Sequence, residues 1–280
     1  MAVTVGLVAQ VIEKIAPKSW AEEWDNVGLL VGSGSKPVER IMLTLDCTLD
    51  VIEEAKEYGA QLIVAHHPLI FRPLKNLRSD NAAAQVPLSL FKNDIAYYAA
   101  HTNLDQSRLS SSPILGELLG LDKMEYLERG YDFNPNRNDA EEHGYGVSGY
   151  LRHPQKLSDL WEKFLEKLKQ AQVYAQAYDL TGVRLAGSLD QEIRKVAIVN
   201  GSGGRFVPKA LFKGADLLIT GDVDHHAALD ALEGGMAIGD LGHFLTEAPM
   251  LKLLKDFLLA EKALQGIEIL VSSRNRSPWI

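Results

Sequence analysis

Five residues of the sequence combine the side-chain types and spacings that bind divalent metal ions. His66 and His67 follow an apolar, strand-like run, and Asp105 closes a later one. His243 and Glu247 are four residues apart, so on a helical turn they lie on one face and can share an ion. Three imidazoles and two carboxylates suit Zn, Mn, Fe, Co or Ni better than Mg or Ca. Five protein ligands are more than one catalytic zinc ion usually has. They therefore predict two divalent ions per chain, about 3.5–4 Å apart and bridged by Glu247.

Each of these residues also has a purely structural interpretation. One of two adjacent histidines is more often an ordinary buried or surface residue than a metal ligand. Asp105 also fits a turn former or the N-cap of a helix over 106–109. The spacing of His243 and Glu247 arises often by accident on helix surfaces. The prediction of a metal site therefore rests on the five residues together.

Two further histidines are candidates for moving protons. His101 precedes Asp105 by four residues, as His243 precedes Glu247, and we predict that His101, His226 and Glu247 serve as proton carriers. The alternative for His101 is a cap on the local turn, and for His226 it is the polar start of a helix. His226 lies in a run of Asp, His and His that resembles a phosphoesterase signature, but the Asp-x-Asp motif that this class also needs has no suitable place here.

A glycine-rich turn offers one more candidate site. Gly201-Ser202-Gly203-Gly204 precedes a helix expected to begin near Phe206, so its backbone amides could cradle a phosphate group. Glycine-rich turns are common, and by itself this one is a weak signal.

The elements that position these residues follow a β-α-β rhythm. Apolar residues at helical spacing predict an amphipathic helix near the N-terminus and another over 157–170, with Ser158 as its N-cap. The other predicted elements are strands over 41–46, 61–65 and 95–100 and helices over 49–58 and 82–91. Strands that alternate with helices in this way indicate an α/β fold with mainly parallel sheets.

The sequence also contains a weak internal repeat. Residues 41–67 and 196–222 both read as strand, polar turn, helix, Gly-Ala and strand, with Gly59 aligned to Gly214. Each copy leads to a closing motif in which a histidine precedes a carboxylate by four residues. We therefore predict a duplicated α/β unit whose two lobes face a dinuclear metal site at the carboxyl ends of the strands. The expected lobes are 1–125 with 236–280, and 126–235, and the polar stretch 132–146 is a loop or lobe boundary.

Composition excludes several classes of protein. No apolar run approaches the roughly 20 residues that cross a bilayer, and the N-terminal pattern is not that of a signal peptide. The single cysteine, Cys47, excludes an intrachain disulfide and a cysteine-rich zinc site, so we expect a cytoplasmic protein. The net charge is −8 and the basic residues do not cluster, which argues against a nucleic-acid partner.

Six sequence blocks, in order along nearly the whole chain, resemble the Nif-three-like family, whose members are also called GTP cyclohydrolase 1 type 2 homologues. The blocks are Trp24-Asp25-Asn26-Val27-Gly28-Leu29, Leu45-Asp46-Cys47-Thr48, His66-His67-Pro68, His101-Thr102-Asn103-Leu104-Asp105, Gly221-Asp222 with His225-His226, and Asp240 to Glu247. The resemblance implies two divalent metals at His66, His67, Asp105, His243 and Glu247, with the glutamate reaching both. It also implies a toroidal homohexamer. Some members carry an extra domain in the middle of the chain, for which this sequence is too short.

The leading hypothesis for function is a metal-dependent hydrolase of a nucleotide or a related small molecule. The name cyclohydrolase implies attack of water on a purine ring, although no residue of the sequence selects guanine. The rival hypothesis is a non-enzymatic metal-binding regulator or scaffold, because the family takes its name from a protein interaction.

Overall fold

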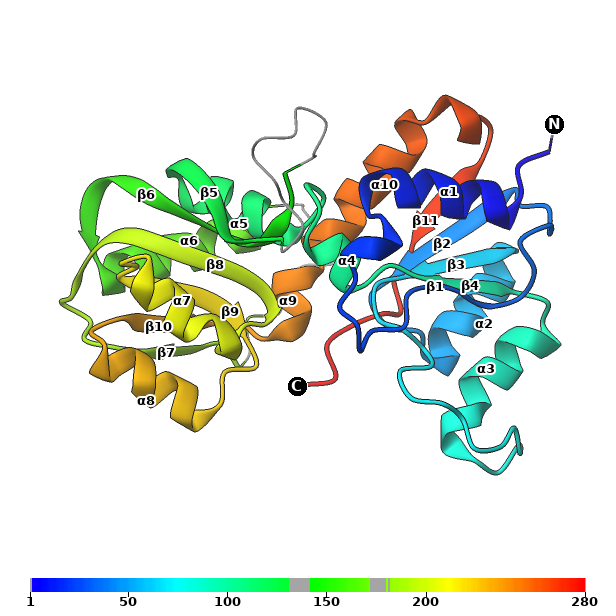
Figure 1. Ribbon diagram of the computed structural model, residues 1–280, viewed down its shortest axis with the longest axis horizontal. Coiled ribbons are helices and arrows are strands. Elements are labelled where there is room, and N and C mark those ends of the chain that lie inside the picture. The colour runs from blue at the N-terminus through cyan, green and yellow to red at the C-terminus, as the bar shows by residue number, and fades with distance from the viewer. Residues whose placement is uncertain (1, 131–141, 172–179, 181, 280) are drawn as a thin grey trace. The chain divides into compact units, whose positions relative to one another are not determined.

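A computed structural model of the chain describes residues 2–130, 142–171, 180 and 182–279 (Figure 1). It divides into two compact units. Unit 1 comprises residues 1–109 and 251–276, and unit 2 comprises residues 110–250 and 277–280. None of the helices in the described residues is long and apolar enough to cross a lipid bilayer.

Unit 1 is built on a five-stranded sheet in the order β1-β4-β3-β2-β11. β2, β3, β4 and β11 are parallel, and β1 pairs with β4 antiparallel at one edge. Its elements are α1 (Val5–Ile15), η1 (Lys18–Trp20), β1 (Gly28–Val31), β2 (Arg40–Thr44), α2 (Leu49–Tyr58), β3 (Leu62–Ala65), α3 (Ala82–Lys92), β4 (Ala96–Ala99), α4 (Thr102–Asp105), α10 (Pro249–Ala260, beginning in unit 2), η3 (Lys262–Leu264) and β11 (Glu268–Val271).

Helices cover both faces of this sheet, with α2 and α3 on one face and α1 and α10 on the other (Figure 1). Successive strand residues point to opposite faces, so Tyr97 packs in the core under α2 and α3 while Tyr98 reaches Glu13 of α1. The predicted helix over 49–58 is confirmed as α2. The Thr48 hydroxyl caps it by accepting a hydrogen bond from the Val51 amide at 3.3 Å.

Unit 2 is built on a six-stranded sheet in the order β5-β6-β8-β9-β10-β7. β8, β9 and β10 are parallel, whereas the pairs β5–β6, β6–β8 and β10–β7 are antiparallel. Its elements are α5 (Ser111–Leu119), β5 (Leu121–Arg129), β6 (Gly144–Lys156), α6 (Leu157–Gln170), β7 (Arg184–Ala186), β8 (Glu192–Ser202), η2 (Gly204–Phe206), α7 (Val207–Phe212), β9 (Leu217–Gly221), α8 (His225–Glu233), β10 (Ala237–Asp240) and α9 (His243–Glu247).

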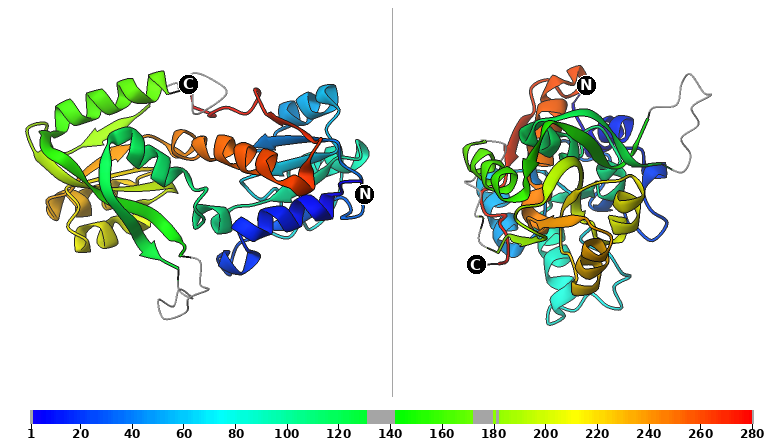
Figure 2. Two further views of the ribbon diagram at one scale, coloured as in Figure 1. Left: turned by 90° about the horizontal axis from the view of Figure 1, so that it is seen from above. Right: turned by 90° about the vertical axis from the view of Figure 1, so that its left-hand side faces the viewer.

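The second sheet is also covered on both faces, by α5 and α6 on one side and by α7 and α8 on the other (Figures 1 and 2). The predicted helix over 157–170 is confirmed as α6, but the prediction that Ser158 caps it is wrong. Lys156 occupies the cap position without a side-chain hydrogen bond. The amides of Leu157 and Ser158 instead donate to the carbonyls of Gln191 and Leu189, at 2.9 and 3.1 Å. The preceding loop therefore satisfies the donors that a capping side chain would serve.

The α/β fold with a duplicated unit is confirmed. β2, β3 and β4 in unit 1 correspond to β8, β9 and β10 in unit 2, since each trio is parallel and in the same order. The aligned glycines Gly59 and Gly214 both adopt a left-handed backbone, with φ of 75° and 70°, at the end of the intervening helix. The sheet of unit 1 is mainly parallel as predicted, whereas the sheet of unit 2 is mixed.

The two units differ from the lobes expected from the sequence. Residues 110–125 and 236–250 belong to unit 2, not to the lobe that contains the N-terminus. β10 stays with unit 2 because it pairs with β9 and β7, and α9 contacts β8 and β9. Of the expected loop 132–146, residues 132–141 lie outside the described residues, and Gly144 begins β6.

Candidate metal centre

His66 and His67 are placed by the buried strand β3. The strand assignment ends at Ala65, but the amides of His66 and His67 donate to the carbonyls of Thr44 and Leu45, at 3.1 and 3.0 Å. The pairing with β2 thus continues through both histidines and fixes their backbones. Their ring centroids are 5.0 Å apart. Both rings therefore turn to one place at the end of the strand.

The Nδ1 atom of each ring has an acceptor within hydrogen-bond distance. His66 Nδ1 donates to the Ala100 carbonyl at 2.8 Å, and His67 Nδ1 donates to Asp46 Oδ1 at 2.8 Å. An acceptor at this position holds the proton on Nδ1 and leaves the lone pair of the neutral ring on Nε2. Metal-binding histidines in proteins are oriented by the same kind of bond, to a carbonyl or a carboxylate.

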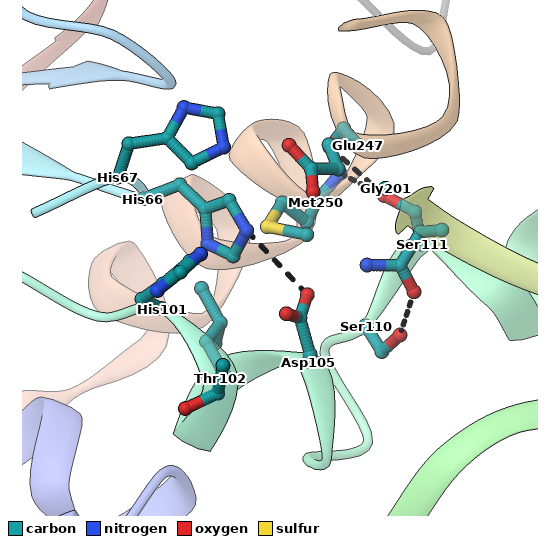
Figure 3. Close-up of polar contacts among 12 residues, drawn as sticks. His66, His67, His101, Thr102, Asp105, Ser110, Ser111, Gly201, Glu247 and Met250 are labelled. Carbon is teal, nitrogen blue, oxygen red and sulfur yellow. Dashed lines mark hydrogen bonds and ion pairs between the residues drawn. The ribbon is translucent and has the colours of Figure 1, made fainter. Parts of the chain in front are cut away.

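His101 completes a group of three imidazoles in unit 1. Ligand atoms of His66, His67 and His101 all lie within 4.8 Å of one another, a spacing that could hold a metal ion, and Figure 3 shows the three rings close together. His101 Nδ1 donates to Asp25 Oδ1 at 2.9 Å. Asp25 also accepts from the amide and hydroxyl of Thr102, at 3.1 and 2.5 Å. Burial opposes the charge on Asp25, but these hydrogen bonds outweigh it and lower its pKa to about 2.

Asp105 lies at the last residue of the short helix α4, so the alternative of an N-cap role is wrong. Its Oδ1 atom is 3.4 Å from His66 Nε2 (Figure 3). Two atoms that each lie about 2.1 Å from one ion, at coordination angles of 90–110°, are about 3.0–3.4 Å apart. His66 and Asp105 therefore have the separation of two ligands of a single ion.

Unit 2 contains a pair of the same kind on α9. His243 Nε2 is 3.0 Å from Glu247 Oε1, which confirms that the two residues share one face of a helical turn. His243 Nδ1 donates to Asp222 Oδ2 at 2.8 Å, so this ring is oriented in the same way as His67. Glu247 is 2% exposed, and burial of a carboxylate is costly unless a cation or hydrogen-bond donors compensate its charge.

Glycines allow α9 to pack closely against the ends of β8 and β9. A Cβ atom on Gly221 would lie 2.6 Å from the backbone of Gly242 and His243, and one on Gly201 would lie 2.3 Å from Glu247 Oε1. The amide of Gly201 donates to Thr246 Oγ1 at 2.9 Å, and the amide of Gly203 donates to the Gly221 carbonyl at 3.3 Å. Two of the four amides of the turn over 201–204 therefore already have protein acceptors, which leaves fewer of them for the phosphate group that the sequence suggested. The glycines serve close packing.

The structure places His226 at the polar start of a helix, which was its alternative interpretation. His226 lies in the exposed first turn of α8, where its amide donates to the capping carboxylate of Asp224 at 2.8 Å. Its ring contacts that of His225, with centroids 5.4 Å apart. His226 belongs to none of the potential metal-binding groups found among the described residues.

Three aspartates that orient imidazoles were missed as functional residues, although their sequence blocks were noted. Asp25, Asp46 and Asp222 each accept from the Nδ1 atom of one histidine. Asp46 is positioned in turn by Asn275. The side-chain oxygen of Asn275 accepts from the amides of Leu45 and Asp46, and its amide group donates to Asp46 Oδ2 at 3.3 Å. An aspartate at the end of a predicted strand was the signal available in the sequence for Asp46 and Asp222.

Comparisons with known proteins show which family this chain resembles. Residues 3–278 match the family described as Duf34/NIF3 (NGG1p interacting factor 3). A "GTP cyclohydrolase 1 type 2 homolog" from Clostridium perfringens is 38% identical over 97% of both chains, and one from Clostridium acetobutylicum is 34% identical over 100% of this chain and 99% of its own. Among solved structures, a Bacillus cereus protein related to NIF3 superposes with a TM-score of 0.86 at 27% identity, covering 100% of this chain and 99% of that one.

Proposed function

This chain belongs to the Duf34/NIF3 family, and from that premise we propose that it is a metal-dependent hydrolase of a nucleotide or a related small molecule. In this proposal the protein holds two divalent transition-metal ions per chain, with Glu247 reaching both. The proposed ligands are His66, His67, Asp105, His243 and Glu247.

The observation that supports the proposal most strongly is the orientation of the imidazoles. The Nδ1 atoms of His66, His67 and His243 are all held by oxygen acceptors, which leaves Nε2 to bind a metal. Within each unit, one Nε2 atom lies 3.0–3.4 Å from a carboxylate oxygen, the separation expected of two ligands on one ion. Nitrogen and oxygen donors in this ratio suit Zn, Mn, Fe, Co or Ni.

Bound divalent ions supply a hydroxide near neutral pH by lowering the pKa of coordinated water. In our proposal the residues around them orient the substrate and move protons. His101 is suited to accept a proton at Nε2, because Asp25 holds Nδ1 and stabilises the imidazolium that results. A nucleotide substrate is suggested by the name of the relatives, "GTP cyclohydrolase 1 type 2 homolog".

The test combines metal analysis with a panel of nucleotides and phosphoesters. We expect close to two transition-metal ions per chain and turnover of at least one compound in the panel. Glu247→Gln should lose metal and turnover, whereas Glu233→Gln, an exposed substitution on α8, should keep both. Metal and compound binding without turnover would favour a regulator or scaffold instead. A protein that binds no metal after reconstitution would refute the proposal.

We also propose that the chain assembles as a toroidal hexamer and acts in the cytoplasm, as the family resemblance implies. Light scattering should then give a mass close to six times the 30.9 kDa of one chain. A monomer whose mass is independent of concentration would contradict the ring.

A further inference from the structure

Two aromatic side chains lie beside the imidazole group of unit 1. The rings of Trp24 and Phe71 are in contact, with centroids 5.7 Å apart, and the Trp24 ring also meets the edge of His101 at 6.2 Å. Trp24 is 54% exposed and Phe71 is 48% exposed. What distinguishes these two rings is that they contact one another beside a polar cluster, so they offer a surface on which a planar ligand can stack.

Hydrogen bonds fix the two loops that carry these rings. Asp25, the residue after Trp24, bonds to His101 and twice to Thr102. Asn26 donates from its side chain to the carbonyl of Ile70, the residue before Phe71, at 2.5 Å. The loop backbones beside the two rings are thus held in place before any ligand arrives, which reduces the conformational entropy lost when one binds.

The size of the exposed pair favours a small ligand over a second protein. Half of two aromatic side chains amounts to roughly 200 Å², whereas a stable protein interface buries about 800 Å² on each partner. A flat ring of a small molecule can cover a surface of this size.

The loop that carries Phe71 is also positively charged in a chain of net charge −8. Arg72 and Lys75 are exposed and make no ion pair within the described part of the chain, while Arg78 is neutralised by Asp80. An aromatic surface followed by two available cations is complementary to a planar ring that bears a phosphate group.

The geometry points to Trp24 and Phe71 as a stacking platform for the heteroaromatic base of a nucleotide, with Arg72 and Lys75 facing its phosphate. This inference rests on the proposed function, since it names the ligand class of the same site. The base stacks on the face of one ring and packs against the other, which is inclined to it by 58°, beside the imidazole group.

Binding of guanosine 5′-monophosphate, measured by calorimetry on both metal-free and metal-loaded protein, tests the platform. Trp24→Ala should weaken binding by about 5- to 150-fold, the range of base stacking on an aromatic side chain, and Phe71→Ala should act in the same direction. Trp24→Phe should retain most of the affinity but abolish the quenching of tryptophan fluorescence by the base. Ribose 5-phosphate, which lacks the base, should bind weakly and equally to the wild type and Trp24→Ala.

The matched control is Trp279→Ala, since Trp279 is 77% exposed and lies in the chain terminus. This variant should bind the nucleotide like the wild type. Wild-type protein that binds no nucleotide, or that binds ribose 5-phosphate as tightly as the nucleotide, would overturn the platform. So would unchanged affinity in Trp24→Ala, or a change in the mass of the assembly in that variant. If the wild-type protein bound no metal or showed no turnover, but its metal-free form still bound the nucleotide through Trp24, the proposed function alone would be refuted.

Discussion

Replacing Gly221 with alanine tests whether the close packing of α9 sets the geometry of the candidate metal-binding pair His243 and Glu247. The added Cβ would lie 2.6 Å from the carbonyl carbon of Gly242 and 2.6 Å from the amide nitrogen of His243. Relaxing these contacts to a normal separation needs a displacement of about 0.8–1 Å. Both contacts are to backbone, so the start of α9 must move with His243.

The expected cost follows from this displacement. Overpacking of a dense interior destabilises by about 1–3 kcal/mol, which lowers the Tm by about 2–12 °C in a protein of this size. The shift also alters the 3.0 Å separation between His243 Nε2 and Glu247 Oε1. Disturbing the groups that orient metal ligands commonly lowers metal affinity by about 10- to 100-fold, and we expect a loss in this range.

The assay pairs thermal unfolding of metal-free protein with a zinc titration against a chromophoric chelator, because the first measures packing and the second measures ligand geometry. Gly204→Ala is the matched control. Its Cβ would meet only Ala227 at 3.6 Å and Asp224 at 4.0 Å, and its backbone is not left-handed. If Gly221→Ala matched Gly204→Ala in both Tm and zinc affinity, close packing would not determine the position of His243.

Three further predictions concern the carboxylates that support the histidines and the chain terminus. Asn275→Asp replaces the amide donor facing Asp46 with a carboxylate, so zinc affinity should fall by about tenfold; Ser273→Ala, which removes one hydrogen bond to Glu54, should leave it unchanged. Burial disfavours the charge on Glu54, but hydrogen bonds from Ser272, Ser273 and Arg274 lower its pKa below 4.5. The stability that ionised Glu54 contributes is then complete above pH 4.5 and is lost as the pH falls through the lowered pKa. In urea unfolding, the difference in free energy of unfolding between wild type and Glu54→Gln should therefore shrink below pH 4.5. A difference that does not depend on pH would contradict this prediction. Asp25→Asn turns an amide toward the donors of Thr102 and should destabilise the fold by about 1–3 kcal/mol, measured by urea unfolding, whereas a neutral result would show that Asp25 is not needed as a carboxylate.

The sequence predicted the elements whose signals are local. The helices over 49–58 and 157–170 have the expected bounds because apolar spacing defines a buried face wherever the segment lies in the fold. The cap at Ser158 and the lobe boundaries were wrong for a common reason. Both depend on contacts with distant segments, namely the carbonyls of Leu189 and Gln191 and the pairing of β10.

The same distinction applies to the candidate site. Histidines and carboxylates at strand ends are visible in the sequence because their chemistry is specific. Asn275 is not, since an asparagine near the C-terminus has many ordinary roles, and only the addition of β11 beside β2 brings it to Asp46. The glycines at 201 and 221 were visible, but their purpose follows from distances to α9 that no sequence pattern encodes.

Comparison of the duplicated units indicates how one ancestral pattern acquired two different tasks. Beyond its third parallel strand, each unit keeps a histidine followed four residues later by a carboxylate, as His101 with Asp105 and His243 with Glu247. Beyond the second strand the units diverge. Unit 1 has two imidazoles at 66 and 67, whereas unit 2 has Gly221, which admits the backbone of α9, and Asp222, which orients His243 from a left-handed backbone with φ of 53°. At these two positions unit 1 therefore has potential nitrogen donors, whereas unit 2 has residues that fix one histidine and one buried glutamate. If Glu247 bridges two ions as proposed, it needs such rigid support more than a terminal imidazole does, because it must satisfy both ions from a single position.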